Sequence, residues 1–233
     1  MAGGLRNQPK VFRGAFVEYG LTIPPLVVVF QFNPLQLSRS RTQEFSMPVS
    51  APGEDAGNGL TLRDFHQDFK DLLQLREAQY VTTHPESIGF EIRLDATDKL
   101  NEGDRLTEQL GIAPQLATLE LMAQPKNESV FGGLVDQLLP GGFSFTCTDK
   151  PPMILFVWGR KRVLPVNINS LTITETEFHA NLEPIRATVA VDLTVIEGPN
   201  PAYMYTKSLK EVMSGLRLAN LRASDVVEVV IPR

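Results

Sequence analysis

The sequence predicts a mainly β protein with some α structure, an antiparallel β barrel or sandwich with a few packed helices. Three stretches indicate this fold: the alternating segments Glu86–Thr97 and Ile185–Val195, and the short apolar run Met153–Trp158. In an alternating segment the apolar side chains all point to one face of a strand, as a half-buried sheet requires. We therefore expect a β-sheet to form the centre of the fold.

The best-defined part of the predicted sheet is a meander of three strands. Met153–Trp158 is almost continuously apolar, as expected of a strand that is covered on both faces. Gly159–Arg162 predicts a charged turn, and Val163–Ile173 predicts the returning strand. The third strand places its apolar residues on one face: Ile185, Ala187, Val189, Val191, Leu193 and Val195.

Two further strands are expected near the start of the chain, at Val11–Val17 and Leu26–Phe32. β-branched and aromatic residues crowd the second of these runs, and prolines lie on both sides of it. Ser46–Gly59 is rich in proline, glycine and small residues, which predicts an exposed loop. Phe143–Thr148 predicts a strand that leads into the meander, and Asn127–Gly142 a loop before it.

Helical spacing predicts four helices, three of them before residue 198. Thr61–Gln79 has apolar residues at intervals of three and four and begins with a capping pair, Thr61 and Asp64. Leu106–Leu110 predicts a short helix, and Pro114 suits the first turn of another. That helix has Leu116, Leu119 and Met122 on one side.

The last segments follow Gly198. Tyr205–Leu221 predicts an amphipathic helix, and Val226–Ile231 predicts either a final strand or an extended arm. We divide the chain into a β domain at residues 1–198, with the loop 46–60 and the helix 61–79 inside it, and a C-terminal helix and arm at residues 199–233.

The amino-acid composition argues against several classes of protein. The 233 residues are 42% hydrophobic and 21% charged, as in an ordinary soluble protein. A formal net charge of −5 argues against a nucleic-acid-binding protein, which needs a basic face. The single Cys147 permits no disulfide within the chain. We see neither a secretory signal nor a run of about 20 apolar residues, so we expect folding in the cytosol and no membrane insertion.

Catalytic and cofactor-binding patterns are missing from the sequence. None of the three histidines, His66, His84 and His179, has a Cys or His neighbour at metal-ligand spacing. There is no GxxxxGK[ST] loop, GxGxxG fingerprint or GxSxG elbow. We therefore predict no catalytic residue, no cofactor and no metal. An enzyme with an unrecognised site is the alternative from another class.

The densest basic cluster is Arg160, Lys161 and Arg162 in the predicted turn. A solubilising turn is favoured over contact with nucleic acid. A charged tip that inserts into a neighbouring subunit is equally compatible with these residues, and the sequence does not separate it from the solubilising turn.

Several blocks in order along the chain indicate a family. They are Phe30–Pro34 (FQFNP), Phe90–Asp98 (FEIRLDATD), Gly111–Leu121, Phe156–Gly159 (FVWG), Arg162–Val166 (RVLPV), Leu171–Glu175 (LTITE) and Asn181–Ala187 (NLEPIRA). Together they resemble the tube-protein domain of contractile injection systems from about Val11 to Gly198. An ordered set of blocks is more specific than any single motif.

This resemblance implies a structural function. Members of the family are similar to the tube-initiating or adaptor proteins of phage-tail-like particles of the antifeeding-prophage type. Such an adaptor forms a six-membered ring, a β barrel that joins the spike hub to the inner tube and templates its first layer. The implied partners are other copies of the chain, the inner tube protein, the spike or hub protein and baseplate proteins. Assembly in the cytoplasm is implied, whether or not the particle is later released.

The sequence departs from the family pattern at its end. Adaptor-type members often have a C-terminal LysM module that binds the baseplate, but only about 35 residues follow Gly198 here. We expect the helix and arm of residues 199–233 to replace this module, or another chain to provide it.

We therefore predict a non-enzymatic tube initiator or baseplate adaptor, with an inner tube subunit of the same particle as the alternative. The predicted ring interface consists of Trp158, Arg160, Lys161, Arg162, Ile185, Val189 and Val191. The predicted baseplate-docking residues are Leu209, Val212, Met213 and Leu216. The polar face of the third meander strand either lines the channel of the ring or faces solvent in a monomeric sandwich; it consists of Arg186, Thr188, Asp192 and Thr194.

Overall fold

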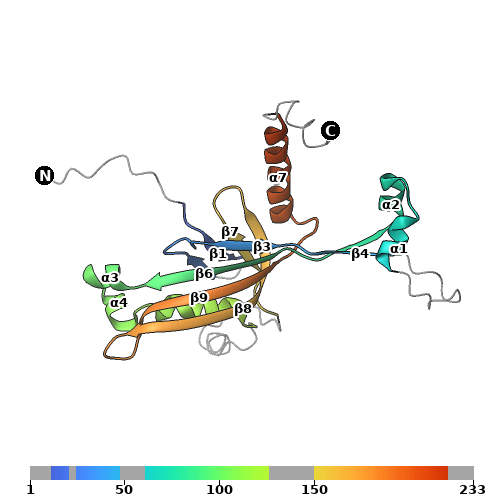
Figure 1. Ribbon diagram of the computed structural model, residues 1–233. Coiled ribbons are helices and arrows are strands. Elements are labelled where there is room, and N and C mark those ends of the chain that lie inside the picture. Colours follow the sequence, from blue (N-terminus) through green and yellow to red (C-terminus); the bar gives the residue numbers. More distant parts are fainter. Residues whose placement is uncertain (1–11, 21–24, 48–60, 126–149, 220–233) are drawn as a thin grey trace, which may run out of the picture. The chain divides into compact units, whose positions relative to one another are not determined.

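The computed structural model describes residues 12–20, 25–47, 61–125 and 150–219 (Figure 1). The chain divides into two compact units, residues 39–87 and residues 1–38 together with 88–233. The expected loop at 48–59, the segments predicted between 127 and 148, and Val226–Ile231 lie outside the described residues. The domain boundary predicted after residue 198 stays a prediction.

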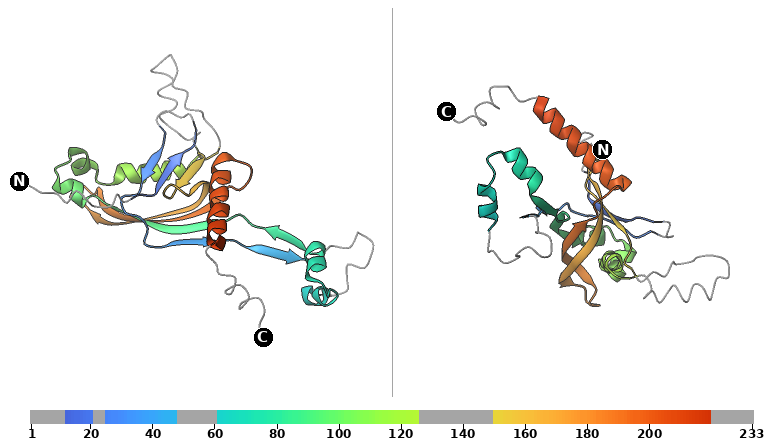
Figure 2. Two further views of the ribbon diagram at one scale, coloured as in Figure 1. Left: turned by 90° about the horizontal axis from the view of Figure 1, so that it is seen from above. Right: turned by 90° about the vertical axis from the view of Figure 1, so that its right-hand side faces the viewer.

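The fold is built on a mainly antiparallel sheet of seven strands in the order β2-β1-β7-β8-β9-β6-β3 (Figures 1 and 2). The strands are β1 (Ala15–Glu18), β2 (Val27–Val29), β3 (Leu37–Ser40), β6 (Ser87–Asp95), β7 (Ile154–Val157), β8 (Val163–Phe178) and β9 (Pro184–Val195). The predicted sheet is confirmed, but its outer strands β2 and β3 do not pair with each other, so it is not closed into a barrel. A sandwich-like α+β fold describes it.

The predicted meander is confirmed as β7, β8 and β9, which pair antiparallel in sequence order. Val191 lies opposite Leu171 and Val189 opposite Ile173. On β9, the alternating apolar residues from Ala187 to Val195 are buried, and Ile185 at its start is partly buried. β8 runs five residues further than the predicted end at Ile173, because backbone pairing with β9 continues through polar residues that the hydrophobic pattern does not mark.

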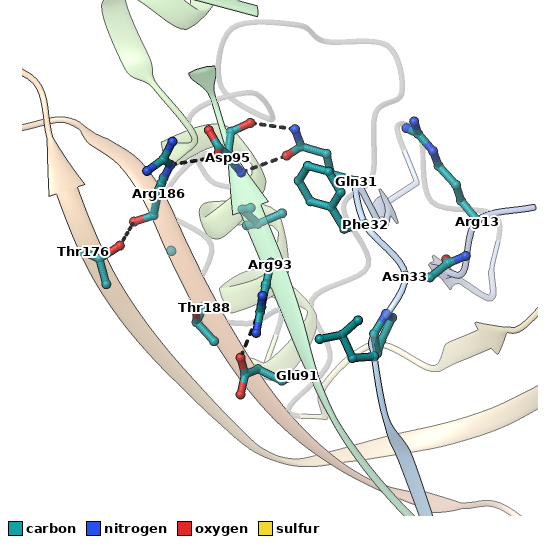
Figure 3. Close-up of a pocket in the computed structure, with 14 residues that line it drawn as sticks. Arg13, Gln31, Phe32, Asn33, Glu91, Arg93, Asp95, Thr176, Arg186 and Thr188 are labelled. Atoms are coloured by element: carbon teal, nitrogen blue, oxygen red, sulfur yellow. Dashed lines mark hydrogen bonds and ion pairs between the residues drawn. The ribbon is translucent and has the colours of Figure 1, made fainter. Parts of the chain in front are cut away.

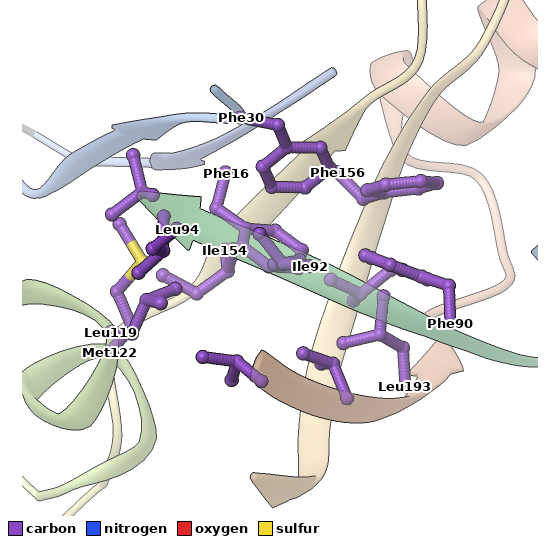
Figure 4. Close-up of a cluster of buried hydrophobic side chains, with 14 of the residues drawn as sticks. Phe16, Phe30, Phe90, Ile92, Leu94, Leu119, Met122, Ile154, Phe156 and Leu193 are labelled. Atoms are coloured by element: carbon purple, nitrogen blue, oxygen red, sulfur yellow. The ribbon is translucent and has the colours of Figure 1, made fainter. Parts of the chain in front are cut away.

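The sheet curls around an aromatic cluster (Figure 4). Phe156 on β7 and Phe90 on β6 stack with their ring centroids 5.3 Å apart. These strands are three places apart in the sheet order, which in a flat sheet is about 14 Å at about 4.8 Å per strand. Phe16 and Phe30 complete the cluster, at 5.2 Å from each other. The contact across the core therefore requires the sheet to bend back on itself.

One helix fills the open side of the curled sheet. α5 (Ala113–Ala123) packs against β8 and β2, and it buries Leu116, Leu119 and Met122 as the spacing predicted. Pro114 lies in its first turn, where a missing N–H costs nothing. The short α3 (Thr97–Asn101) and α4 (Arg105–Leu110) precede it.

The predicted single helix over Thr61–Gln79 is wrong. The structure has two short helices, α1 (Leu62–Gln67) and α2 (Leu72–Ala78). The predicted capping box is present, with Thr61 and Asp64 bonded reciprocally. Asp71 starts a second helix by accepting a bond from the Leu73 N–H at 3.0 Å, and this local cap competes with continuation of the first helix.

The unit at residues 39–87 also contains a strand pair, β4 (Gln43–Ser46) and β5 (Tyr80–Thr83). Its apolar side chains are largely exposed, and Leu72 is 78% accessible. Glu86 is 3% accessible and is held by Arg39 and by Arg41, the latter at 3.6 Å. The apolar face predicted from helical spacing therefore contributes no buried residue in α1 or α2.

The burial of alternate residues on β9 predicts that two adjacent substitutions destabilise the protein to very different extents. Val191→Asp places an unpaired charge at a fully buried site and is expected to cost about 3 kcal/mol or more, which unfolds much of the protein. Ala190→Asp introduces the same charge on the exposed face and should cost less than about 1 kcal/mol. Thermal unfolding followed by circular dichroism compares the two variants; equal unfolding temperatures would contradict the assigned face.

Candidate functional site

Three blocks that lie far apart in the sequence meet at one corner of the sheet (Figure 3). The Gln31 side chain donates to the Asp95 carbonyl at 2.7 Å and accepts from the Asp95 N–H at 2.9 Å. Gln31 follows β2, and Asp95 ends β6. The amide side chain thus pairs with the end of β6 in the way that a neighbouring strand would.

Arg186 on β9 joins the same corner from the other side. Its Nε donates to the Asp95 carboxylate at 2.7 Å, and its Nη1 donates to Glu177 on β8 at 2.6 Å. Its Nη2 donates to the Thr97 hydroxyl at 3.2 Å. The guanidinium therefore ties together β6, the start of α3 and the end of the β8–β9 hairpin.

The carboxylate of Asp95 is stabilised in its charged form. Partial burial raises its pKa, but hydrogen bonds from Thr97 and the charge of Arg186 outweigh burial, so the pKa of Asp95 lies below its ordinary value. Hydrogen bonding to Asp95 and its negative charge raise the pKa of Arg186 in turn. We call Gln31, Asp95 and Arg186 the polar clamp.

An open hollow of about 840 Å³ lies beside the polar clamp. Phe32, Pro34 and Leu35 line it from the segment after β2, and Glu91 and Arg93 line it from β6. Among the described residues that line it there is no histidine or cysteine, and Asp95 and Arg186 are bonded to each other. The charged groups beside the hollow therefore form a structural ion pair, and the hollow itself is an open depression of the surface.

Each of the three histidines has its own local surroundings. His84 pairs with Glu44 at 3.1 Å, and His66 lies 3.1 Å from the Gln79 amide nitrogen. His179 is in the turn between β8 and β9, where its Nε2 is buried without a hydrogen-bond partner in the described part of the chain. Over the described residues no three His, Cys, Asp or Glu side chains gather as a metal site. Cys147 lies outside the described residues.

The structure separates the predicted ring-interface residues into two groups. Trp158 stacks on Phe156 at 5.9 Å, and the Arg160 guanidinium lies over the Phe12 ring at 5.2 Å. This group, with Lys161 and Arg162, surrounds the β7–β8 turn. Ile185, Val189 and Val191 lie on β9, where Val189 and Val191 are fully buried in the core of the single chain. Their role between subunits stays a prediction.

The predicted docking residues share one stripe on α7 (Pro201–Ala219). Val212 and Leu216 are 58% and 62% accessible, Met213 is also exposed, and Leu209 is partly buried. The N-terminal part of α7 is fixed to the sheet, because the Thr206 hydroxyl accepts from the Val163 N–H and donates to the Val163 carbonyl. The Tyr205 hydroxyl also donates to the Arg160 carbonyl at 2.9 Å.

Sequence reasoning missed the polar clamp. No local pattern joins Gln31, Asp95 and Arg186, since they are more than sixty residues apart from one another along the chain. All three stand in blocks quoted for the family resemblance, which was the available signal. The sequence places His179 in a turn, but the positive φ of Leu182 in the turn between β8 and β9 was missed as well.

A family model described as "Contractile injection system tube protein" matches residues 24–200, which is most of the chain. A comparison with curated proteins gives no match. In the described residues no helix is long and apolar enough to span a membrane.

The polar clamp predicts a pH-dependent contribution to stability. Because the folded-state pKa of Asp95 is lowered, its contribution is complete above the unfolded value of about 3.9 and is lost as the pH falls through the folded value. Asp95→Asn should lower the unfolding temperature by roughly a few degrees at pH 7, and the difference from the unmodified protein should shrink as the pH falls below about 3.9.

Thermal unfolding at a series of pH values measures this difference. Glu91→Gln is the matched control, because Glu91 is exposed and lies 3.7 Å from Arg93. A constant difference for Asp95→Asn between pH 7 and pH 3 would rule out a charged clamp.

Proposed function

The chain belongs to the family of contractile injection system tube proteins, and on this premise we propose that it is the tube initiator or baseplate adaptor of a phage-tail-like particle. Its copies form a ring that joins the spike or hub protein to the inner tube and starts tube assembly. Family membership establishes a structural role in such a system. The position in the particle and the six-fold ring are the proposal.

The observation that supports the ring most directly is the open sheet. β2 and β3 are its outer strands, and neither has a further strand partner among the described residues. Val27 and Val29 of β2 are exposed, as are the last three residues of β3. Unprotected edges are a liability for a monomer, which favours a chain that works as one of several copies. A contact between two unlike surfaces of neighbouring copies generates a ring when the rotation closes.

The polar face of the sheet suits a channel lining. Asp192 of β9 accepts a hydrogen bond from Ser170 of β8 at 2.9 Å, and Thr194 accepts one from Asn169. On the neighbouring β6, Glu91 pairs with Arg93. This face therefore presents hydroxyls and compensated charges to solvent, so it should let a polar cargo pass without binding it tightly. The buried face is fully used by the core of the single chain.

Helix α7 supports the second half of the proposal, docking on the baseplate. Asn200 caps the helix by accepting from the Tyr203 N–H at 2.8 Å, and Thr206 is 1% accessible. Beyond Thr206 no residue up to Arg217 is fully buried, so the apolar stripe of Val212, Met213 and Leu216 is left uncovered. A helix held at one end with an uncovered stripe is suited to lie in an apolar groove of a partner.

The second candidate is an inner tube subunit that is stacked in many layers. The description of the family as a tube protein favours it, and the same open sheet serves both functions.

Copy number separates the two candidates. An adaptor is expected at about six copies per particle, since one closed ring is present. A tube subunit is expected at copies comparable to those of the sheath protein. Quantitative mass spectrometry of purified particles, with the sheath protein as the internal standard, makes the measurement. Absence of the chain from the particles would contradict both.

The docking role of α7 predicts the effect of Leu216→Asp. The side chain is exposed, so the unfolding temperature should change little, while incorporation into particles should fall roughly tenfold because an apolar contact is lost. Ser214→Asp adds the same charge elsewhere on the helix and should leave incorporation unchanged. Equal incorporation of the two variants would exclude docking through this stripe.

A further inference from the structure

The turn between β8 and β9 presents an apolar tip. Leu182 is 81% accessible and Phe178 is 49% accessible. Leu182 has a φ of 67°, and no other non-glycine residue in the described part of the chain has a positive φ. A side chain with a β-carbon is strained in this conformation, and asparagine or glycine would be more stable there. Neither burial nor turn geometry explains a leucine at this position.

The tip is held rigidly. Within the turn, the His179 N–H donates to the Glu183 carbonyl at 2.8 Å and the Leu182 N–H donates to the His179 carbonyl at 2.9 Å. The Asn181 side chain donates to the Gln109 carbonyl at 3.1 Å. Gly111, with a φ of 53°, lies so close that an added β-carbon would be 2.1 Å from the Pro184 carbonyl oxygen. A rigid apolar tip loses little conformational entropy on binding.

Carboxylates surround the tip. The elements at this end are α3, α4 and the hairpin, joined by the contacts of Asn181 with Gln109 and of Arg186 with Thr97. Their acidic residues outnumber the nearby cations Lys99, Arg105 and Arg186. The acidic residues are Asp98, Glu102, Asp104, Glu108, Glu175, Glu177 and Glu183, with Asp95 at the adjoining end of β6. This end of the molecule is therefore acidic.

The opposite end of β8 has the reverse charge. β8 spans sixteen residues, so its ends are about 50 Å apart at about 3.3 Å per residue. The turn that precedes it contains Arg160, Lys161 and Arg162 without an acidic residue. Exposed aromatic rings lie beside this basic turn, since Phe12 lies under Arg160 and Tyr205 binds the Arg160 carbonyl. One end thus combines exposed apolar groups with an excess of negative charge, and the other combines them with a basic turn.

We propose that neighbouring copies of this chain bind head to tail, with the Leu182 tip and its carboxylates on the basic β7–β8 turn of the next copy. The inference rests on the proposed ring and names its contact surfaces. A contact between two different surfaces is the kind that repeats around a ring. Opposite charges set the direction of the contact, and the apolar tip and aromatic rings add affinity at its centre.

A charge exchange tests the contact. Lys161→Glu and Glu183→Lys alone should each weaken self-association of the purified full-length chain roughly fivefold to tenfold at low salt. The double variant should recover to within roughly threefold of the unmodified protein, because the pair is restored in reverse. Sedimentation velocity over a concentration series measures the association. An unmodified chain that stays monomeric, or a double variant weaker than either single one, overturns the proposal.

Leu182→Asn tests the apolar tip without damaging the fold. Asparagine adopts a positive φ more readily than leucine, so the unfolding temperature should stay the same or rise, while self-association falls roughly tenfold. Leu72→Asn is the control, since Leu72 is equally exposed but lies in α2. Unchanged self-association of Leu182→Asn overturns a role for the tip.

Incorporation of the variants into particles shows whether this inference or the proposed function has failed. If the unmodified chain is present at about six copies and Leu182→Asn and Glu183→Lys are incorporated equally well, the ring stands and these contact surfaces are wrong. The contact surfaces are supported if both variants are lost while Leu72→Asn is retained. If the tip variants self-associate normally but lose the inner tube protein from the particle, the tip binds that protein and the head-to-tail contact is wrong.

Discussion

The contact of four phenylalanine rings across the core is the interaction on which the rest of the structure depends. Phe16, Phe30, Phe90 and Phe156 come from both halves of the sheet order, so they meet only when the sheet bends back on itself. Bending buries one face completely, and α5 covers the remaining opening. As a consequence the other face and both outer strands stay exposed, and these are the surfaces that an assembly of many copies can use.

The polar clamp has a complementary effect at the end of β6. A bent sheet needs its strand ends fixed, and Asp95 is bonded to Gln31 on one side and to Arg186 on the other. Charged hydrogen bonds of this kind are directional, so they position the β8–β9 hairpin against α3 and α4. The position of the hairpin in turn determines where Leu182 is presented. A structural ion pair and an exposed assembly surface are therefore linked through one strand.

Family membership and the open sheet together make the chain a part of a larger object rather than a self-sufficient domain. Uncovered apolar groups are found at the tip of the hairpin, on α7, along β2 and in the unit at residues 39–87. Each lies on an element that is fixed by hydrogen bonds or by strand pairing. Such preorganised surfaces bind with a small loss of conformational entropy, which favours ordered addition of copies and partners.

The sequence by itself determined the local structure and the family. Alternation on β6 and β9, the spacing of Leu116, Leu119 and Met122, and the cap at Thr61 depend on neighbours along the chain, so a linear pattern reveals them. The tertiary structure alone decided the rest. It extended β8, left the sheet open and brought Gln31, Asp95 and Arg186 together. These features depend on backbone pairing and on contacts between distant residues, neither of which leaves a periodic trace in the sequence.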